Sequence, residues 1–534
     1  MCRMPAISAA DLGVPQVFNA ASWFVDRHSE EGRAESVAIE CGDERVTYRQ
    51  LAERVNRCGS ALRELGVRPE ERVALLLSDE PAFAYAFFGV LKIGAVAVPF
   101  NTLLKEHDYR YLLQDTRAVA LIVSAALLPA VQGVLGQERG RLRHVLVVGS
   151  TVMAGAMSFD DFLASASPTL EAEPTCRDDA AFWLYSSGST GTPKGCVHLH
   201  HDMRICAELF GRGVLGITAA DRTFSVAKLF FAYGLGNALY FPLAVGATTI
   251  LWSGAPAPAN VYAVIERHRP TLFYSVPTGY GMLLAHTRER GPDFDLSSVR
   301  IAVSAGEALP PALFDRFKQR FGLEIIDGIG STEALHMFIS NRPGSVRPGS
   351  SGEIVEGYEA RILDASGQPV ADGDIGNLWV KGDSVCAAYW NKHEQTKETI
   401  EGGWLRTGDK YTQDADGYFW YAGRSDDMLK VGGQWVSPVE VENALLQHPD
   451  VQECGVVGRE DQDTLVKPMA FVVLRAGIEA TAARGVELEQ FVRTRLAHYK
   501  RPRWVAFLPE LPKTATGKIQ RFKLRQLASL DGPS

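Results

Sequence analysis

Short apolar runs alternate with helical patterns along most of this chain, and this alternation is the feature that most limits the folds open to it. In "TYRQLAERVNRCGSALRELG" the residues Leu51, Val55 and Leu62 recur at helical spacing, and the pattern ends at Gly66. The strand-like run "ERVALLLS" follows directly. The same succession recurs in residues 81–100 and 313–330. Repeated strand and helix segments predict a doubly wound α/β body.

A chain of 534 residues exceeds what one hydrophobic core usually supports, so more than one domain is expected. Two changes in sequence pattern indicate where the chain divides. From about residue 345 turn-rich strands predict a β-rich subdomain. Beyond "YAGRSDD" a second α/β pattern appears, with helices expected at 438–450 and 487–497 and strands at 451–458 and 469–475. We expect a large N-terminal body over residues 1–423 and a small mobile α+β domain over residues 424–534.

Composition limits the partners and the compartment. The net charge of −8 shows no basic surplus, which argues against nucleic acid as a partner. The eight cysteines form no CxxC pair and no zinc-like spacing, which favours a reducing compartment. No apolar run reaches bilayer-spanning length, and the first residues lack the pattern of a secretory signal. We therefore expect a cytoplasmic protein, a monomer or homodimer, without a membrane partner.

The segment "YSSGSTGTPKG", residues 185–195, combines three glycines with five serine and threonine side chains and Lys194. Such a loop can turn successive backbone N–H groups toward one phosphate, and a lysine adds a point charge. A Walker loop is excluded, because it requires Ser or Thr after the lysine and Gly195 stands there. Strand-like flanks predict a hairpin. Alone, the composition would fit a flexible linker almost as well.

Four more segments follow in a fixed order: "DGIGSTE" (327–333), "TGDKY" (407–411), "GRSDDMLKVGGQWVSP" (423–438) and "PKTATGKIQR" (512–521). With the glycine-rich loop they resemble the signature motifs of the adenylate-forming acyl-CoA synthetases. The resemblance implies that a carboxylic acid is first joined to ATP with release of pyrophosphate, and that the thiol of coenzyme A then displaces AMP. It implies ATP, Mg²⁺ and coenzyme A as cofactors.

The resemblance also implies roles for single residues. The expected contacts to the β- and γ-phosphates are Ser187, Gly188, Ser189, Thr190, Gly191 and Lys194. Thr332 would touch the α-phosphate and Glu333 would hold Mg²⁺, which takes hard oxygen ligands. The alternative for Glu333 is an acid in the first turn of a helix capped by Ser331 or Thr332.

The nucleoside is expected to lie against two groups of residues. Asp409, with Arg424 downstream, would bind the ribose hydroxyls, although alone it would fit a turn aspartate. Gly306, Glu307 and Asp327 resemble the segments that flank adenine. For Glu307 a loop or helix-cap role is the alternative.

The last two motifs concern the small domain. Lys518 would reach the reacting carboxylate and α-phosphate as the main catalytic cation. Asp426 would be the hinge about which this domain rotates between the two half-reactions, and Gly433 would border the pantetheine arm. A surface lysine and plain linker acids are the alternatives.

The acid itself is suggested by "SVAKLFFAYGLGNALYFP", whose aromatic density resembles the benzoate-CoA ligase branch of the family. An aromatic acid suits a slot lined by flat rings and small residues. The candidate walls are Phe231, Tyr233, Ala305, Gly330, His336 and Met337. An aromatic stripe is more often core, and this is the role expected for Phe230 and Tyr240. If His336 reaches the substrate ring, it could form a hydrogen bond with a hydroxyl or amino group beside the carboxylate. Benzoate, 2-aminobenzoate and hydroxybenzoates are therefore all candidate substrates. The alternative for His336 is a purely structural role.

Three other hypotheses compete with an aryl-CoA ligase. One is a freestanding adenylating enzyme that loads a carrier protein, one is a non-catalytic nucleotide-binding protein, and one is an oxygen-using luciferase-like enzyme. Retention of the charged residues of all five motifs argues against the non-catalytic binder. The run "HLHH", residues 198–201, suggests a metal, but no acidic or cysteine residue is spaced to complete a cage, and we expect no zinc.

Overall fold

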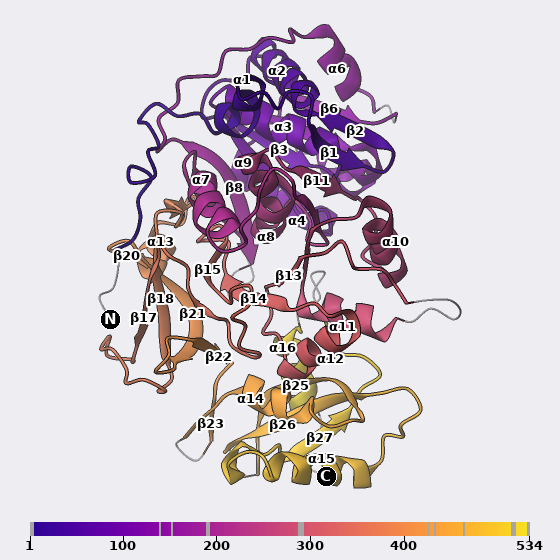
Figure 1. The fold of residues 1–534 in the computed structure, drawn as a ribbon, viewed down its shortest axis with the longest axis vertical. Helices are drawn as coiled ribbons and strands as arrows, with labels where there is room; N and C mark the ends of the chain where they lie inside the picture. Colours follow the sequence, from indigo (N-terminus) through magenta and orange to yellow (C-terminus); the bar gives the residue numbers. More distant parts are fainter. Residues whose placement is uncertain are drawn as a thin grey trace.

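The computed structural model describes residues 5–137, 140–150, 153–187, 193–286, 293–425, 427–431, 434–462, 465–513 and 519–530. Two large sheets form the body, a smaller antiparallel sheet lies beside them, and the C-terminal residues form a separate α+β layer (Figure 1). The predicted doubly wound body and β-rich region are therefore both present.

The first sheet contains the glycine-rich hairpin at one side. Its order is β19 (Ala388–Tyr389), β9 (Pro193–Leu199), β8 (Ala180–Ser187), β4 (Val96–Pro99), β3 (Arg72–Leu76), β5 (Ala120–Ser124), β6 (His144–Val148) and β7 (Met157–Ser158). The strands from β8 to β7 pair in parallel, whereas β9 pairs antiparallel with both β8 and β19. Strands β4 and β5 are buried along their whole length, as expected for parallel strands covered on both faces.

The second sheet contains the "DGIG" motif on β14. Its order is β16 (Glu353–Ile354), β15 (Met337–Ser340), β14 (Ile325–Gly330), β13 (Ile301–Ser304), β12 (Leu272–Ser275), β10 (Arg222–Ser225), β11 (Thr248–Leu251), β1 (Val37–Cys41) and β2 (Glu44–Thr47). Parallel pairing runs from β14 to β1. The carboxyl ends of β12, β13 and β14 therefore meet at one edge, the position where open α/β sheets bind ligands.

The two sheets share one core. Alternate residues of β3 divide between two apolar clusters, so that Val73 and Leu75 face the shared core and Ala74 and Leu76 face another. On the second sheet Tyr274 and Val303 join the same shared core. Period-two alternation along a strand produces this division. The two sheets thus border one shared core that also contains helices, and each sheet packs against further helices through its other face.

Helices α2 (Tyr48–Glu64) and α3 (Pro81–Lys92) pack together inside this shared core. Thr47 and Gln50 form a capping box at the start of α2. Gly59 and Gly89 allow the close approach, because a Cβ at Gly59 would lie 3.0 Å from the Gly89 carbonyl oxygen. All twelve residues of α3 are buried, which explains why the segment is apolar on every side.

The remaining helices lie in the shared core, on the other faces of the sheets and in the connections. In the first 250 residues they are η1 (Ser22–Asp26), α1 (Arg27–Glu30), α4 (Glu106–Thr116), η2 (Ala125–Ala130), α5 (Gln132–Gln137), α6 (Phe159–Ser165), α7 (Asp202–Cys206), η3 (Ala207–Arg212), α8 (Ala232–Leu235), η4 (Gly236–Tyr240) and α9 (Phe241–Val245). The next are α10 (Pro258–His268), α11 (Pro277–Ala285), α12 (Pro311–Phe321) and α13 (His393–Thr399).

The antiparallel sheet and the C-terminal layer complete the chain. The sheet contains β17 (Glu359–Leu363), β18 (Gly376–Lys381), β20 (Ile400–Glu401), β21 (Trp404–Gln413) and β22 (Phe419–Arg424). Beyond it lie β23 (Leu429–Val431), β24 (Gln434–Val436), α14 (Pro438–Leu445), β25 (Val451–Glu460), β26 (Val466–Leu474), α15 (Ala482–Arg493), η5 (His498–Lys500), β27 (Trp504–Phe507) and α16 (Arg521–Leu530). Helix α15 begins five residues before the predicted position, because Thr481 caps it by accepting from the backbone N–H of Arg484.

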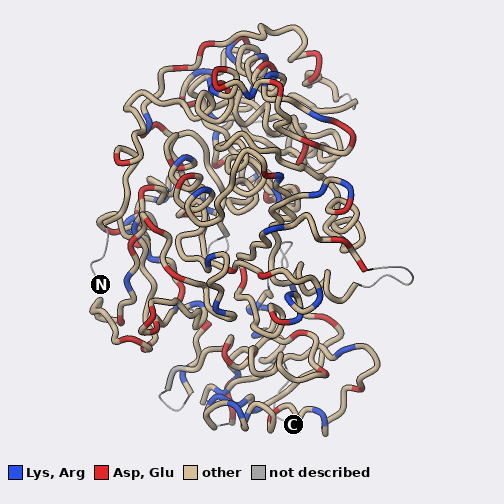
Figure 2. The backbone as a smooth tube through the Cα atoms, viewed as in Figure 1, with Lys and Arg blue, Asp and Glu red and all other residues tan. Residues whose placement is uncertain are grey.

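Charged residues of both signs are interspersed along the whole molecule (Figure 2). In the described part of the chain, no helix combines the length and the apolar character that crossing a membrane requires.

Candidate active site

The glycine-rich segment connects the antiparallel strands β8 and β9, so the predicted hairpin is confirmed. Ser186 pairs with Lys194, and Ser187 pairs with Pro193. Gly188, Ser189, Thr190 and Gly191 lie outside the described residues, as does the side chain of Ser187. The Lys194 ammonium lies 4.9 Å from the ring centroid of Tyr389, which a neighbouring strand brings beside the hairpin.

Glu333 lies in the turn between β14 and β15, so the helix-start alternative for this residue is wrong. Its Oε1 accepts hydrogen bonds from the Ser186 hydroxyl at 3.0 Å and the Tyr389 hydroxyl at 2.8 Å. Within the described part of the chain no hydrogen bond reaches Oε2. Glu333 and Lys194 thus share Tyr389 as a neighbour. The Glu333 carboxylate, which follows β14 of the second sheet, contacts Ser186 in the hairpin of the first sheet.

Three successive backbone carbonyls hold this turn in place. Thr332 O accepts from His198 Nε2 at 2.8 Å, Glu333 O from the Cys386 N–H at 2.7 Å, and Ala334 O from the Ser384 hydroxyl at 2.8 Å. Buried carbonyls require such partners. The position of Thr332 and Glu333 is therefore set by contacts to the backbone carbonyls from β9 and from residues 384–386.

The residues expected around adenine meet at the carboxyl ends of β13 and β14. Asp327 pairs with Ser304 across these strands and is 6% exposed. Burial raises the pKa of Asp327 well above its usual range. Glu307 accepts from the Thr278 hydroxyl at 3.0 Å, and the exposed Gly306 has a φ of +89°, a conformation that favours glycine. Glu307 precedes α12, which starts at Pro311, and its Oε2 also accepts from the backbone N–H of Thr278 in the first turn of α11 at 3.3 Å, as the helix-cap alternative expects.

Asp409 and Arg424 stand opposite each other on β21 and β22. Arg424 donates to Asp409 Oδ1 at 3.2 Å and to the Thr407 carbonyl at 3.0 Å. The Asp409 side chain is 13% exposed and that of Arg424 is 44% exposed. A carboxylate so placed can accept hydrogen bonds from vicinal hydroxyls while the guanidinium balances its charge.

The six candidate wall residues lie between the shared core and the edge of the second sheet. Ala305, His336 and Met337 are buried, whereas Phe231, Tyr233 and Gly330 are partly buried. The Tyr233 hydroxyl donates to the carbonyls of Val303 and Ser275 at strand ends. As expected, Phe230 and Tyr240 are core residues, at 5% and 0% exposed.

His336 is 3% exposed and has unequal ring nitrogens. Its Nε2 lies 3.1 Å from Asn237 Oδ1, whereas its Nδ1 is buried without a hydrogen-bond partner among the described residues. Burial lowers the pKa of His336 to about 3, so the ring is neutral at physiological pH. With the Asn237 amide oriented in this way, its oxygen accepts from Nε2, which therefore holds the proton. A Cβ at Gly236 would lie 2.5 Å from the ring, so glycine is what lets His336 pack here.

Two surface hollows lie elsewhere and contain none of these residues. The larger, about 500 Å³, is lined by charged side chains such as Asp26, Lys92 and Glu171, and the smaller, about 200 Å³, by Arg45 and its neighbours. Open hollows with so many charged groups do not fit an aryl ring.

Lys518, Gly433 and Asp426 lie outside the described residues, and their roles stay predictions. Next to the expected hinge, Asp427 lies 2.6 Å from Arg525 and 3.5 Å from Arg521 of α16. Asp427 is therefore tied to the C-terminal layer and is not a plain linker acid.

Comparison with known proteins identifies the chain. The family model for the AMP-binding enzyme matches residues 26–390, and the model for the AMP-binding enzyme C-terminal domain matches residues 440–518. The chain belongs to the AMP-binding enzyme family. Among its relatives, the benzoate–CoA ligase of Thauera aromatica is 49% identical over 517 residues, 96% of each chain. The 4-hydroxybenzoate–CoA/benzoate–CoA ligase of Rhodopseudomonas palustris is 42% identical over 512 residues, 96% of this chain and 94% of the relative.

Solved structures of AMP-binding enzymes agree with the fold. The anthranilate CoA ligase AuaEII in complex with anthranoyl-AMP has a TM-score of 0.92 and 48% identity, covering 98% of this chain and 99% of that one. A benzoate CoA ligase from Burkholderia xenovorans has a TM-score of 0.88 and 46% identity, covering 95% and 100%. The resemblance predicted from the five motifs and the predicted fold class are both confirmed.

Sequence reasoning missed Ser186 and Tyr389, which contact Glu333, and His198, which holds Thr332. Ser186 lies inside the glycine-rich motif, and that proximity was the available signal. Tyr389 has no signal in the sequence, because only the pairing of β19 with β9 brings it to the hairpin. The "HLHH" run, which contains His198, suggested a metal site and not a contact with the Thr332 carbonyl. In the described residues no group of three or more His, Cys, Asp or Glu side chains could hold a metal ion.

Proposed function

We propose that this AMP-binding enzyme is an ATP-dependent aryl-CoA ligase of the AMP-forming type. It activates benzoate or a small amino- or hydroxy-substituted benzoate as an aryl-adenylate and transfers the acyl group to coenzyme A. The proposal is carried by the meeting of Glu333 with the Lys194 hairpin through Tyr389 and Ser186. The aromatic substrate class is supported by the full-length relatives that are named as benzoate, hydroxybenzoate and anthranilate CoA ligases. A cytoplasmic location and a monomeric or homodimeric state stay predictions.

In the first half-reaction a carboxylate oxygen bonds to the α-phosphorus of ATP, and the bond to pyrophosphate breaks. Nucleophile and target are both anionic, so positioned cations are expected to supply most of the catalysis. Lys194 would face the leaving phosphates, and Lys518 would stabilise the charge between the carboxylate and the α-phosphate. Asp409 would fix the ribose, and the buried Asp327 would lie near the base. In the second half-reaction the thiolate of coenzyme A bonds to the acyl carbon and AMP leaves.

Glu333 fits a magnesium ligand by its own chemistry. Two hydroxyls orient one carboxylate oxygen and leave the other for a hard cation. When bound, Mg²⁺ would neutralise charge on the phosphates. Glu333 thereby holds the positive charge on the side of the site that faces the hairpin.

His336 is proposed to select ring substituents. Its Nδ1 is a buried acceptor that the described chain leaves unused, while the surrounding rings of Phe210, Tyr233 and Phe241 are apolar. A hydroxyl or amino group beside the substrate carboxylate could donate to it. Benzoate would leave this nitrogen unsatisfied, which costs binding free energy.

Replacing His336 by alanine is therefore expected to lower kcat/KM for 2-aminobenzoate and 2-hydroxybenzoate about 10- to 100-fold more than for benzoate. Steady-state kinetics with each acid measures this ratio. Because the pKa of His336 is lowered to about 3, the acceptor stays neutral and the wild-type ratio stays constant from pH 6 to pH 9. Phe210→Leu, which alters the packing around the ring but removes no acceptor, is the control. Equal losses for all acids in His336→Ala would contradict a ring contact.

The test of the function itself is pyrophosphate release by the wild-type enzyme with ATP and Mg²⁺ over benzoates, cinnamates and short fatty acids, with and without coenzyme A. Selective release with benzoates that continues to the aryl-CoA thioester is the expected result. Adenylation that does not proceed with coenzyme A would instead favour loading of a carrier protein. Absence of release with every acid would overturn the enzyme assignment.

A further inference from the structure

His198 at the end of β9 is held between two acceptors, and neither ring nitrogen faces solvent. Nδ1 lies 2.7 Å from Asp202 Oδ2, and Nε2 lies 2.8 Å from the Thr332 carbonyl oxygen. The side chains of His198 and Asp202 are both 0% exposed. A carbonyl can only accept, so Nε2 must be the donor whatever the position of the proton shared with Asp202. The ring therefore connects a buried carboxylate to the backbone of the Glu333 turn.

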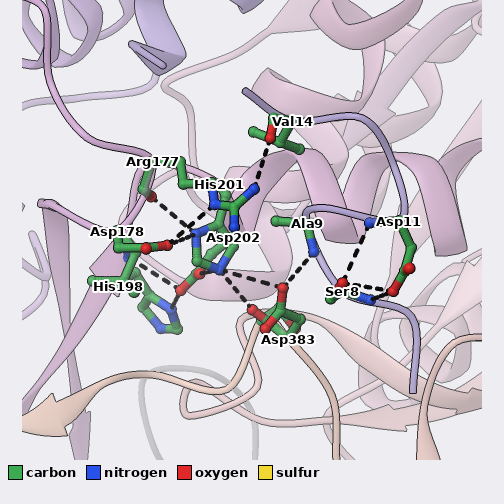
Figure 3. A network of polar contacts seen from close by, with 12 residues as sticks. Ser8, Ala9, Asp11, Val14, Arg177, Asp178, His198, His201, Asp202 and Asp383 are labelled. Atoms are coloured by element: carbon green, nitrogen blue, oxygen red, sulfur yellow. Dashed lines mark hydrogen bonds and ion pairs between the residues drawn. The ribbon is translucent and has the colours of Figure 1, made fainter. Parts of the chain in front are cut away.

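Asp202 is itself fixed by its surroundings (Figure 3). The backbone N–H of Leu199 donates to Asp202 Oδ2 at 3.1 Å, and His201 Nε2 lies 3.2 Å from Oδ1. His201 is anchored in turn on the carbonyl oxygens of Arg177 and Asp383. The His198 ring also stacks on Phe182 of β8, with ring centroids 5.2 Å apart. The orientation of His198 is thus determined by the hairpin strands and by α7.

The orientation of His198 bears on the position of the Thr332–Glu333 turn. Strand β9 carries Lys194 near its beginning and His198 near its end, so one strand presents the cation of the hairpin and the bond to Thr332. The neighbouring carbonyls of the turn are held from residues 384 and 386. Among the described residues, the His198 bond alone ties the first of the three carbonyls to the hairpin strands.

We propose that His198, oriented by Asp202, is a positioning residue that fixes the Thr332–Glu333 turn against the phosphate hairpin, and so sets the place where magnesium and the nucleotide are held. This inference rests on the proposed function of Glu333. It assigns no contact between His198 and substrate. It concerns the first half-reaction, because the metal and the pyrophosphate take part only there.

The substitutions His198→Gln and His198→Asn both introduce an amide, and they distinguish the bond of Nε2 to Thr332 from that of Nδ1 to Asp202. The amide nitrogen of His198→Gln extends to the place of Nε2 and can still donate to Thr332, whereas that of His198→Asn reaches only the place of Nδ1. We expect His198→Asn to lower kcat for pyrophosphate release about 10- to 100-fold and to raise the Mg²⁺ concentration for half-saturation, because a buried carbonyl loses its donor. His198→Gln is expected to recover most of this loss. The KM for the aryl acid stays within about twofold in both.

Two further measurements separate positioning from folding and from the proposed function. Conversion of pre-formed benzoyl-AMP with coenzyme A is expected to be unchanged in His198→Asn, since this step uses neither metal nor pyrophosphate. His200→Asn is the matched control, because His200 is equally buried on the same segment but bonds the Ala20 N–H and not the turn. Binding of Mg·ATP by calorimetry requires no acid, and we expect about tenfold weaker binding in the asparagine variant alone.

Equal effects of asparagine and glutamine, or losses in both half-reactions that follow the loss of thermal stability, would overturn the positioning role. If wild-type enzyme bound Mg·ATP but activated no benzoate, the proposed function would fail while the calorimetric comparison still tested His198.

Discussion

Replacing Lys518 by alanine is expected to lower aryl-acid-dependent pyrophosphate release about 100- to 1,000-fold, because the transition state loses the cation between two anionic reactants. The family resemblance of "TATGKIQR" carries this expectation. On either side of residues 514–518 the chain is paired with itself, since Lys513 and Ile519 form an antiparallel bridge and the Gln520 N–H donates to the Pro512 carbonyl. Pyrophosphate release at saturating ATP and acid measures the effect.

The control for Lys518→Ala is the second half-reaction. Transfer of the aryl group from pre-formed aryl-AMP to coenzyme A should stay within about threefold of wild type, because no negative charge then meets another at phosphorus. Lys513→Ala, a nearby lysine that pairs with Glu453 on β25, is the matched variant and should retain activity. A full loss in both half-reactions would indicate damage to the C-terminal layer rather than a missing catalytic cation.

Glu333→Gln is expected to lower pyrophosphate release on the order of 100-fold or more, and to raise the Mg²⁺ requirement, because an amide oxygen binds magnesium far more weakly than a carboxylate. The substitution keeps the side-chain size, so the hydroxyls of Ser186 and Tyr389 still have an oxygen to contact. Initial rates over a range of Mg²⁺ at fixed ATP measure both effects.

Tyr389→Phe is the companion to Glu333→Gln. It removes one hydroxyl donor and leaves the carboxylate, so a smaller loss of about tenfold is expected, with partial recovery at high Mg²⁺. A Glu333→Gln enzyme with wild-type Mg²⁺ dependence would show that the carboxylate does not hold the metal.

The fold was predictable from sequence wherever local pattern and tertiary packing agree. Residues 48–64 carry a capping box and a helical apolar stripe, and the hairpin at 185–195 is flanked by strand-forming runs, so both elements appear where the pattern places them. The start of α15 was missed because a threonine cap, not the apolar stripe, sets it. The turn at Glu333 was open to a helical alternative, since Ser-Thr-Glu is also a helix start, and only the carbonyl contacts from distant residues exclude it.

The candidate site was predictable as a list of motifs but not as a set of contacts. Lys194 and Glu333 are 139 positions apart, and the residue that joins them, Tyr389, lies on a two-residue strand without a motif. His198 was noticed for its residue type, yet its partner Asp202 belongs to the next helix and Thr332 to another sheet. Such contacts depend on how the sheets pack, which local spacing does not encode. The same holds for the neutral state of His336, which results from burial.

The three bonds to the carbonyls of Thr332, Glu333 and Ala334 come from the hairpin strand and from the segment that leads from the antiparallel sheet to β19. The turn is thus a junction where separate sheets must all be in register, whereas the strands within each sheet are joined by their own ladders of hydrogen bonds. Heating should therefore disturb the junction before it melts any sheet. The temperature at which adenylation stops should fall below the temperature at which the far-ultraviolet circular dichroism signal is lost, and bound nucleotide should bring the two together.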